Sequence, residues 1–425
     1  MIGEALDTAN ASKPGLFYGW YIVAAAAAIA FVAWGVAFWN IGVFLHAFHE
    51  ERGWSLSALS GSATLFSILA GLTGLVAGRV VDRRGPRVVL IFGGALTGLA
   101  MLALSRAAEL WQVYACNAVL AVGYGCIHVL VLSALVSRWF RRRRALAMTF
   151  ALTGSSVGGL VLVPLSTTLI GQFGIGTAAT ALGLVAWGIV LPVALLVVRD
   201  HPASLGLAID GDNSPVEDAT VVQADRLWTV RDALGTAAWW TLTLAFTLTL
   251  LGQVAYLVHQ VSFLSGTLGL AGAGFAVAIT TTAGVIGRFA MGGVGDRVSK
   301  RALAIGSCLL QAAGVLASIA LPIPVVLYAS AGVVGLTIGI VVALHPLMTA
   351  EWFGVRSYGT VYGPAYLATQ LGQAAGPLLV GVLVDLTGGY GLPFTLTASA
   401  ALVAAGLLAI GVRAPSADVG SAATP

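Results

Sequence analysis

Charged residues are scarce in this chain of 425 residues: Asp, Glu, Lys and Arg together make up 9%, against 58% hydrophobic residues. Soluble globular domains carry about a quarter charged residues, so that class of protein is excluded. Cysteine is also rare, and the three present, Cys116, Cys126 and Cys308, lack metal-ligand spacing. No nucleophile–base pair or phosphate-binding loop is visible. We therefore expect no enzyme, cofactor, metal or nucleic-acid partner.

Long hydrophobic runs are abundant instead. Windows of about 20 apolar residues, enough for a helix to cross a bilayer, recur twelve times. They lie near 20–45, 56–78, 88–105, 110–137, 146–170, 176–198, 237–263, 271–293, 302–321, 324–350, 359–384 and 393–412. The first run is too long for a cleaved signal peptide, so we expect it to persist in the mature protein. The sequence predicts an all-α polytopic membrane protein, with the lipid bilayer as its surroundings.

The basic residues indicate how the spans are oriented. Most of the 21 Lys and Arg residues fall in loops on one side of the predicted membrane, whereas Arg52 and Arg106 fall on the other. Short loops rich in Lys and Arg remain in the cytoplasm, so both termini are predicted to be cytoplasmic. Arg288 is the one basic residue inside a predicted span.

The chain also contains a tandem repeat. Three anchors recur at an offset of 213 or 214 residues: "GRVVDRRGPR" (Gly78–Arg87) with "GGVGDRVSKR" (Gly292–Arg301), Trp139-Phe140 with Trp352-Phe353, and Pro164 with Pro377. The repeat predicts five parts: a cytoplasmic N-terminus (1–19), a first six-helix half (20–198), a cytoplasmic linker (199–235), a second six-helix half (236–412) and a cytoplasmic tail (413–425). Within the linker, Thr229 and Asp232 form a capping pattern that predicts a short surface helix.

The stretch Gly78–Arg87 has the pattern G-x-x-x-D-R-x-G-x-R and resembles the signature loop of the major facilitator superfamily. The second copy is degraded, with Ser299 in place of the family glycine. The resemblance implies twelve transmembrane helices in two six-helix pseudo-symmetric halves, and transport by alternating access between the halves. It also implies a cytoplasmic charge network that holds the outward-open state. The residues of that network here are Asp82, Arg83, Arg87, Asp296, Arg297 and Arg301, although the charges of the loop could instead serve topology alone, above all Arg83.

Arg288, in "ITTTAGVIGRFAMGG" (Ile279–Gly293), is the leading candidate for substrate binding. A charge within a span is costly and usually faces a cavity, and transporters of this architecture bind substrate near the bilayer midplane. The alternative is a side chain that snorkels to an interface about 9 Å away. The residues at i−4 and i−7, Gly284 and Thr281, form a small surface that favours the cavity. Because no acid lies within a predicted span, we expect the substrate to supply one carboxylate.

A closer resemblance agrees with this expectation. "FYGWYIVAAAA" (Phe17–Ala27) and "RGWSLSALSGSATLF" (Arg52–Phe66) resemble the bacterial monocarboxylate porters and the neighbouring oxalate:formate antiporters. In both groups helix 8 carries a substrate-binding arginine, which corresponds to Arg288. Animal members place an aspartate at the position of Gly284, and its absence questions a shared proton mechanism. The oxalate exchangers add a lysine in helix 11, where this chain has Gln370 and its neighbours, which argues against a dianion.

The resemblance therefore implies a secondary active transporter of a small monocarboxylate, coupled to a proton as co-substrate. We expect a functional monomer in the inner membrane of a bacterium. Two alternatives stay open: an exchanger of organic anions that needs no proton, and a non-transporting membrane sensor on the same fold.

Depth along the spans suggests further substrate-binding candidates. Tyr124, His128 and Gln370 fall in the middle third, Tyr366 and His345 lie slightly closer to the cytoplasm, and Asn40 is placed at the outer vestibule. Their hydroxyl, amide or ring nitrogen groups could bind a second substrate oxygen, although each could equally be a packing residue.

His259, nearer the outer side, is the candidate for proton coupling, because histidine titrates near neutral pH. A histidine hydrogen-bonded to a neighbouring helix is the alternative. The small-residue stripes "LTGSSVGGLVLVP" (Leu152–Pro164) and "LATQLGQAAGP" (Leu367–Pro377) are predicted to be surfaces on which helices slide.

Overall fold

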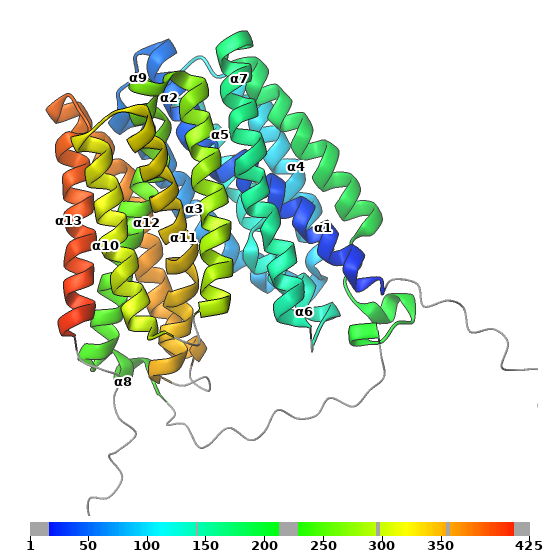
Figure 1. Ribbon diagram of the computed structural model, residues 1–425. Coiled ribbons are helices and arrows are strands. Elements are labelled where there is room, and N and C mark those ends of the chain that lie inside the picture. Colours follow the sequence, from blue (N-terminus) through cyan, green and yellow to red (C-terminus); the bar gives the residue numbers. More distant parts are fainter. Residues whose placement is uncertain (1–16, 142, 212–227, 295–297, 354–357, 412–425) are drawn as a thin grey trace, which may run out of the picture.

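Every regular element that the computed structural model describes is helical, and the described residues are 17–141, 143–211, 228–294, 298–353 and 358–411. The membrane helices are α1 (Gly19–Val32), the π-helix η1 (Ala33–Phe38), α2 (Ile41–Arg52), α3 (Leu56–Arg84), α4 (Pro86–Leu104), α5 (Leu110–Ile127), α6 (Val129–Trp139), α7 (Arg144–Pro192), the π-helix η2 (Val193–Val197), α9 (Ala237–Val294), α10 (Lys300–Ala320), α11 (Pro324–Phe353), α12 (Tyr358–Thr387) and α13 (Gly391–Ile410). Figure 1 shows them standing side by side in one bundle.

Ten helical segments among the described residues are long and apolar enough to cross a membrane. Two of them, α7 and α9, each contain a sharp kink and comprise two helices, at Gly174 (φ 81°) and Gly269 (φ 70°). A positive φ is readily adopted by glycine, which has no Cβ. With each kinked segment counted as two crossings, the predicted all-α fold with twelve crossings is confirmed.

Two crossings are broken where the sequence predicts continuous spans. The first passes from α1 through η1 and a turn at Trp39 and Asn40 before α2 begins. The fourth is split at His128, whose backbone is extended (φ −79°, ψ 173°), between α5 and α6. The residues before that split, "GYGCIH", include two glycines, which favour helix weakly and bring the backbone close to neighbouring helices. Local composition and close packing thus account for this break.

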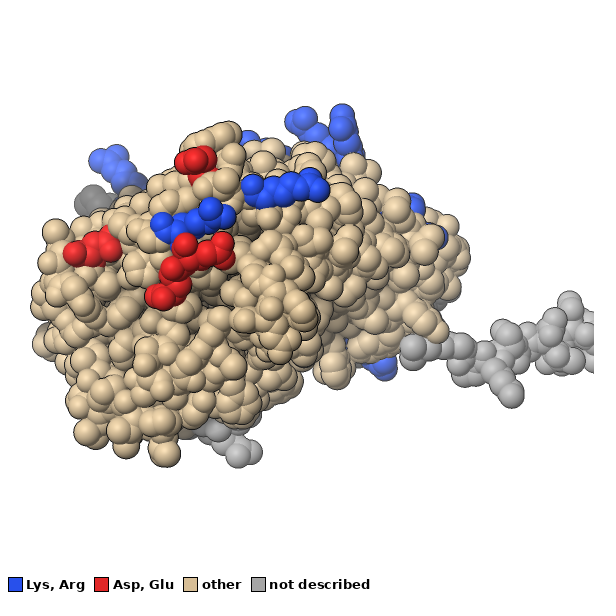
Figure 2. Space-filling view, turned by 90° about the horizontal axis from the view of Figure 1, so that it is seen from above, with Lys and Arg blue, Asp and Glu red and all other residues tan. Residues whose placement is uncertain are grey.

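The linker end of the bundle is the end that holds the turn at Gly85, the turn after Trp139 and the short helix α8 (Val230–Leu234). Thr229 caps α8 and forms a capping box with Asp232, which confirms the predicted surface helix. Seen from the opposite end, from above in Figure 1, the molecule exposes few charged side chains on a largely uncharged surface (Figure 2). Residues 212–227 of the predicted linker, residues 1–16 of the predicted N-terminus and the whole predicted C-terminal tail lie outside the described residues.

The first six and last six crossings pack together through α3 with α12, α2 with α9, and α7 with α9. Several hydrogen bonds join them at or toward the end opposite the linker. The Asp385 carboxylate of α12 accepts from the backbone amides of Leu56 (3.1 Å) and Ser57 (2.7 Å), the first residues of α3. The Thr64 hydroxyl of α3 donates to the Ala374 carbonyl of α12 at 2.6 Å. These contacts hold the two sets of helices together at that end.

Candidate functional site

Arg288 lies in the second crossing of α9 and is half-buried. Its Nη2 donates a hydrogen bond of 2.8 Å to Oγ of Ser156, a buried residue of α7. Among the described residues, no Asp or Glu pairs with Arg288. The guanidinium therefore bridges the first and last six crossings while most of its hydrogen-bonding capacity stays open.

The packing of α9 explains the direction in which this side chain leaves the helix. A Cβ at Gly339 of α11 would lie 2.1 Å from the Gly284 carbonyl oxygen and 2.9 Å from the Arg288 amide nitrogen. Glycine is required for this close approach, so Gly284 contacts α11 rather than a cavity, which corrects the interpretation made from sequence. Thr281 faces α7 instead, because a Cβ at Gly159 would lie 2.4 Å from its methyl group. Arg288 and Thr281 thus share the side of α9 that faces α7.

Two clusters of rings include the predicted binding residues. In the first, the His128 ring stacks on Trp34 of η1 at 4.7 Å and lies 4.8 Å from the Tyr124 ring. In the second, the His345 ring of α11 stacks on Phe246 of α9 at 4.6 Å. These contacts show that both histidines pack within their own half.

Residues of α12 extend the second cluster. Tyr362 lies 4.9 Å from the His345 ring and 5.8 Å from the Tyr366 ring, which is 41% exposed. Gln370, one turn further along, accepts a hydrogen bond of 2.8 Å from Gln373.

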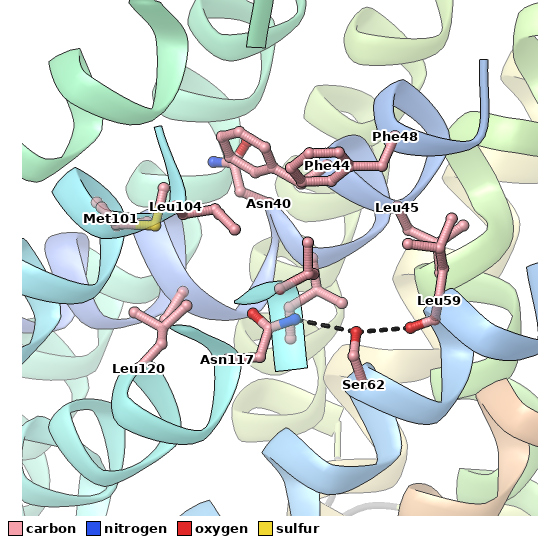
Figure 3. Close-up of a pocket in the computed structure, with 14 residues that line it drawn as sticks. Asn40, Phe44, Leu45, Phe48, Leu59, Ser62, Met101, Leu104, Asn117 and Leu120 are labelled. Atoms are coloured by element: carbon pink, nitrogen blue, oxygen red, sulfur yellow. Dashed lines mark hydrogen bonds between the residues drawn. The ribbon is translucent and has the colours of Figure 1, made fainter. Parts of the chain in front are cut away.

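Asn40 lies elsewhere, in a pocket formed by η1, α2, α3, α4 and α5 (Figure 3). The pocket has a mostly apolar lining. The Asn40 amide nitrogen donates to the Gly35 carbonyl at 2.5 Å, and its oxygen is buried without a partner among the described residues. Across the pocket, Asn117 donates to Ser62 (3.0 Å), which donates to the Leu59 carbonyl (2.7 Å). The pocket lies within the first six crossings, so Asn40 is not brought together with Arg288.

His259 is fully buried between α3 and α12. Its Nε2 lies 2.9 Å from the Pro377 carbonyl and 3.1 Å from the Ser60 hydroxyl, and its Nδ1 lies 3.3 Å from the Tyr390 hydroxyl. Because a carbonyl can only accept, the proton of the neutral ring is on Nε2, and Nδ1 accepts from Tyr390. Burial raises the pKa of the Tyr390 hydroxyl, which therefore remains protonated at neutral pH. A second proton would have to bind at Nδ1.

Two of the predicted gating arginines cap helix ends. Arg87 donates to the carbonyls of Ala194 (3.2 Å) and Leu195 (2.5 Å), and Arg301 donates to those of Leu408 (2.5 Å) and Ala409 (3.1 Å). Donors and acceptors alike are related by the repeat offset of 214 residues. A cation near helix carbonyls is stabilised by the helix dipole, so the repeat uses the same cap twice. Arg83 is exposed. Asp296, Arg297 and the side chain of Asp82 lie outside the described part of the chain.

Two residues of the interface between the crossings were not predicted as site residues. Ser156 belongs to the stripe Leu152–Pro164, which the sequence suggests is a sliding surface, and the adjacent pair Ser155-Ser156 was the available signal. Asp385 lies at the end opposite the linker, and its contact with α3 has no local signature in the sequence.

The helical bundle with a cation between its crossings is typical of a polytopic membrane carrier, and comparisons with known proteins agree. The family model "Major Facilitator Superfamily" matches residues 23–277 and 242–424. The chain belongs to this family of transporters, as the signature loop predicts. A bacterial homologue of the human lysosomal transporter Spinster, crystallised in an inward-facing and occupied conformation, shares the fold with a TM-score of 0.69 and 14% identity, over 94% of this chain and 97% of that one.

Three curated relatives are similar at higher identity than that solved structure, over different shares of the chain. Monocarboxylate transporter 13 of Bos taurus is 27% identical over 94% of this chain and 90% of its own length. The oxalate:formate antiporter of Oxalobacter formigenes is 25% identical over 59% of this chain and 57% of its own length. "MFS-type transporter 1" of an Ophiocordyceps species is 32% identical, but the match spans only 38% of this chain and 36% of that protein. The predicted resemblance to monocarboxylate porters and oxalate:formate antiporters is confirmed at the level of similarity.

Proposed function

We propose that the protein is a proton-coupled secondary transporter of a small monocarboxylate, with Arg288 as the carboxylate anchor. The observation that carries the proposal is the half-buried guanidinium, held by Ser156 and without an acidic partner among the described residues. A desolvated cation needs an anion, and the planar guanidinium fits a carboxylate in a bidentate manner. The similarity to monocarboxylate transporter 13 and to the oxalate:formate antiporter supports an organic anion as the cargo.

Alternating access would then move the two six-helix halves against each other around Arg288. The linker end is the cytoplasmic end, both termini are cytoplasmic, and the protein acts as a monomer in the inner membrane of a bacterium. In the conformation described, hydrogen bonds accepted by Asp385 and formed by Ser60 and Thr64 join the halves toward the outer end. The gating network of Asp82, Arg83, Arg87, Asp296, Arg297 and Arg301 acts at the cytoplasmic end.

Proton coupling is assigned to His259. Its Nδ1 can take up a proton, and its Nε2 lies beside Ser60 of the other half. Protonation of the ring would therefore change the strength of a hydrogen bond between the halves. Substrate binding is assigned to the two ring clusters, through Tyr124, His128, Tyr366 and His345, together with Gln370. Asn40, in its separate pocket, would act on the bend of the first crossing rather than on the carboxylate.

The test is uptake of labelled acids into proteoliposomes that contain the purified protein. The panel comprises lactate, pyruvate, acetate, formate, oxalate and aromatic acids, with and without an inward proton gradient. Uptake of a monocarboxylate that rises with the gradient supports the proposal. Counterflow that ignores the gradient would indicate an organic anion exchanger, and binding without flux would indicate a membrane sensor.

A further inference from the structure

The buried ring of His259 has one nitrogen that can still take up a proton, and a tyrosine hydroxyl lies against it. Nε2 carries the proton that the Pro377 carbonyl accepts, so a second proton has to bind at Nδ1. Among the described residues, the group in hydrogen-bonding contact with Nδ1 is the Tyr390 hydroxyl, at 3.3 Å. A proton therefore reaches Nδ1 either through this hydroxyl or after Tyr390 has moved away.

Packing holds the Tyr390 ring in place. It lies 5.1 Å from the ring of Phe394, 5.5 Å from that of Phe263 and 5.7 Å from that of His259. Its backbone, by contrast, belongs to the turn between α12 and α13 at the end opposite the linker, where a Cβ at Gly389 would meet no atom within 4 Å. Tyr390 thus reaches from an open turn to the buried imidazole, and delivery through its hydroxyl requires no movement of the packed rings.

A second hydroxyl lies further toward the same end. Ser262 is one turn beyond His259 in the first crossing of α9, at the i+3 position and therefore on the same face of the helix. Its Oγ is buried and lies close to the Tyr390 hydroxyl, but not in hydrogen-bonding geometry with it or with any other described group. Buried hydroxyls are nearly always hydrogen-bonded, so Ser262 is suited to bind a water molecule. Ser265, one turn further still, donates to the Ser262 carbonyl at 3.1 Å and continues this line of hydroxyls toward the kink at Gly269.

The charge beside this line of hydroxyls is negative. Asp385 of α12 is exposed at the end opposite the linker and acts electrostatically on both His259 and Tyr390. His49 of α2 acts in turn on Asp385, and α3 presents only the uncharged Ser60 to the His259 ring. An exposed carboxylate raises the local concentration of cations, protons included. The surroundings therefore favour the arrival of protons from this end.

We propose that Tyr390 and Ser262 relay protons from the water at the end opposite the linker to Nδ1 of His259. This inference rests on the proposed function, in which His259 carries the coupled proton. In each transfer the Tyr390 O–H bond breaks while the bond between that hydrogen and Nδ1 forms, and the phenol oxygen takes a proton from a water molecule held at Ser262. The water then recovers a proton from the bulk, so His259 gains one positive charge and Tyr390 ends neutral. Because burial raises the pKa of the Tyr390 hydroxyl, a free phenolate is disfavoured and the two transfers occur together.

The deciding variant is Tyr390→Phe in the full-length protein, because it removes the hydroxyl and keeps the ring that packs on Phe394. Tyr328→Phe is the matched control: Tyr328 is also half-buried, but its ring packs on Phe275. The proteins are reconstituted into proteoliposomes, and uptake driven by a proton gradient is measured with the acid that the unmodified protein takes up fastest among lactate, pyruvate, acetate, formate, oxalate and aromatic acids. Counterflow of the same acid, which needs no net movement of protons, is measured in parallel.

We expect Tyr390→Phe to lower gradient-driven uptake about tenfold or more, since a positioned group speeds proton transfer by roughly 10²- to 10⁴-fold. Counterflow should survive. The pH profile should change as well: uptake by the unmodified protein levels off in acid once His259 is protonated, whereas uptake by Tyr390→Phe, limited by the arrival of protons, should keep rising as the external pH falls. Ser262→Ala should show the same pattern with a smaller loss, because water can still reach the Tyr390 oxygen.

The inference is overturned if Tyr390→Phe matches Tyr328→Phe in gradient-driven uptake and in pH profile. It is also overturned if counterflow falls as far as uptake, which would indicate a structural role for the hydroxyl. Should Tyr390→Phe not fold, unchanged uptake by Ser262→Ala overturns it.

His259→Gln separates this inference from the proposed function. If His259→Gln flattens the pH profile while Tyr390→Phe behaves like the control, the relay fails and coupling through His259 stands. If the unmodified protein takes up none of these acids, or if its uptake ignores the gradient, the proposed function fails and the relay fails with it.

Discussion

Replacement of Asp385 by Asn should favour the conformation in which the halves separate at the end opposite the linker. Each carboxylate oxygen accepts one backbone amide of α3, from Leu56 at 3.1 Å and Ser57 at 2.7 Å. Asparagine keeps one acceptor oxygen and loses the negative charge at the helix N-terminus. A lost N-cap acceptor costs about 1 kcal/mol, which is roughly a fivefold change in an equilibrium constant. Because the contact crosses between the halves, this change should appear as a shift in population.

Pulsed electron paramagnetic resonance between two spin labels measures this shift. One label at Ala108 and one at Gly389 report on the two halves at that end, and a side chain at Gly389 meets open space. The three free cysteines are replaced beforehand. Glu51→Gln is the control, since Glu51 pairs with the adjacent Arg52 in its own helix at 3.6 Å. Identical distance distributions in Asp385→Asn and the parent would refute the reasoning.

Three further predictions concern the proton and the linker end. Asp82→Asn should preserve folding and ligand binding while slowing transport, and normal flux would leave only a topological role for that charge. His259→Gln should flatten the pH dependence of uptake while counterflow survives, because the glutamine amide has no basic nitrogen that can take up a proton. An unchanged pH profile would place coupling elsewhere. Arg87→Gln and Arg301→Gln should each lower the free energy of unfolding of the purified protein by about 1 to 3 kcal/mol, because each removes charged hydrogen bonds to helix carbonyls. The control Arg83→Gln, at an exposed residue, should leave the free energy of unfolding within about 0.5 kcal/mol of the parent.

The sequence was sufficient to predict the crossings and the family, because a bilayer dictates the length and apolarity of each span. It also placed Arg288 within a span, since a lone cation in an apolar segment is visible without any tertiary information. The paired caps of Arg87 and Arg301 follow the repeat, although the carbonyls they bind became evident only in three dimensions.

Other features of the site depend on contacts between distant segments. The partnership of Arg288 with Ser156 joins residues 132 positions apart, and hydroxyl residues are common in small-residue stripes. The break at His128 was missed because hydropathy reports whether a segment is apolar and not whether its backbone is continuous. Asn40 was assigned by depth alone, and depth does not reveal which helices surround a residue.

The most direct test of the central claim is carboxylate binding by Arg288→Gln and Arg288→Lys, measured at matched membrane levels with Arg106→Gln as a control at the opposite end. We predict that Arg288→Gln abolishes binding, with a loss of about 2 to 5 kcal/mol for a desolvated charged pair. Lysine keeps the charge without the planar fork, so Arg288→Lys should retain weak binding with reduced selectivity among acids. Near-normal affinity for the same acids in both variants would contradict the account.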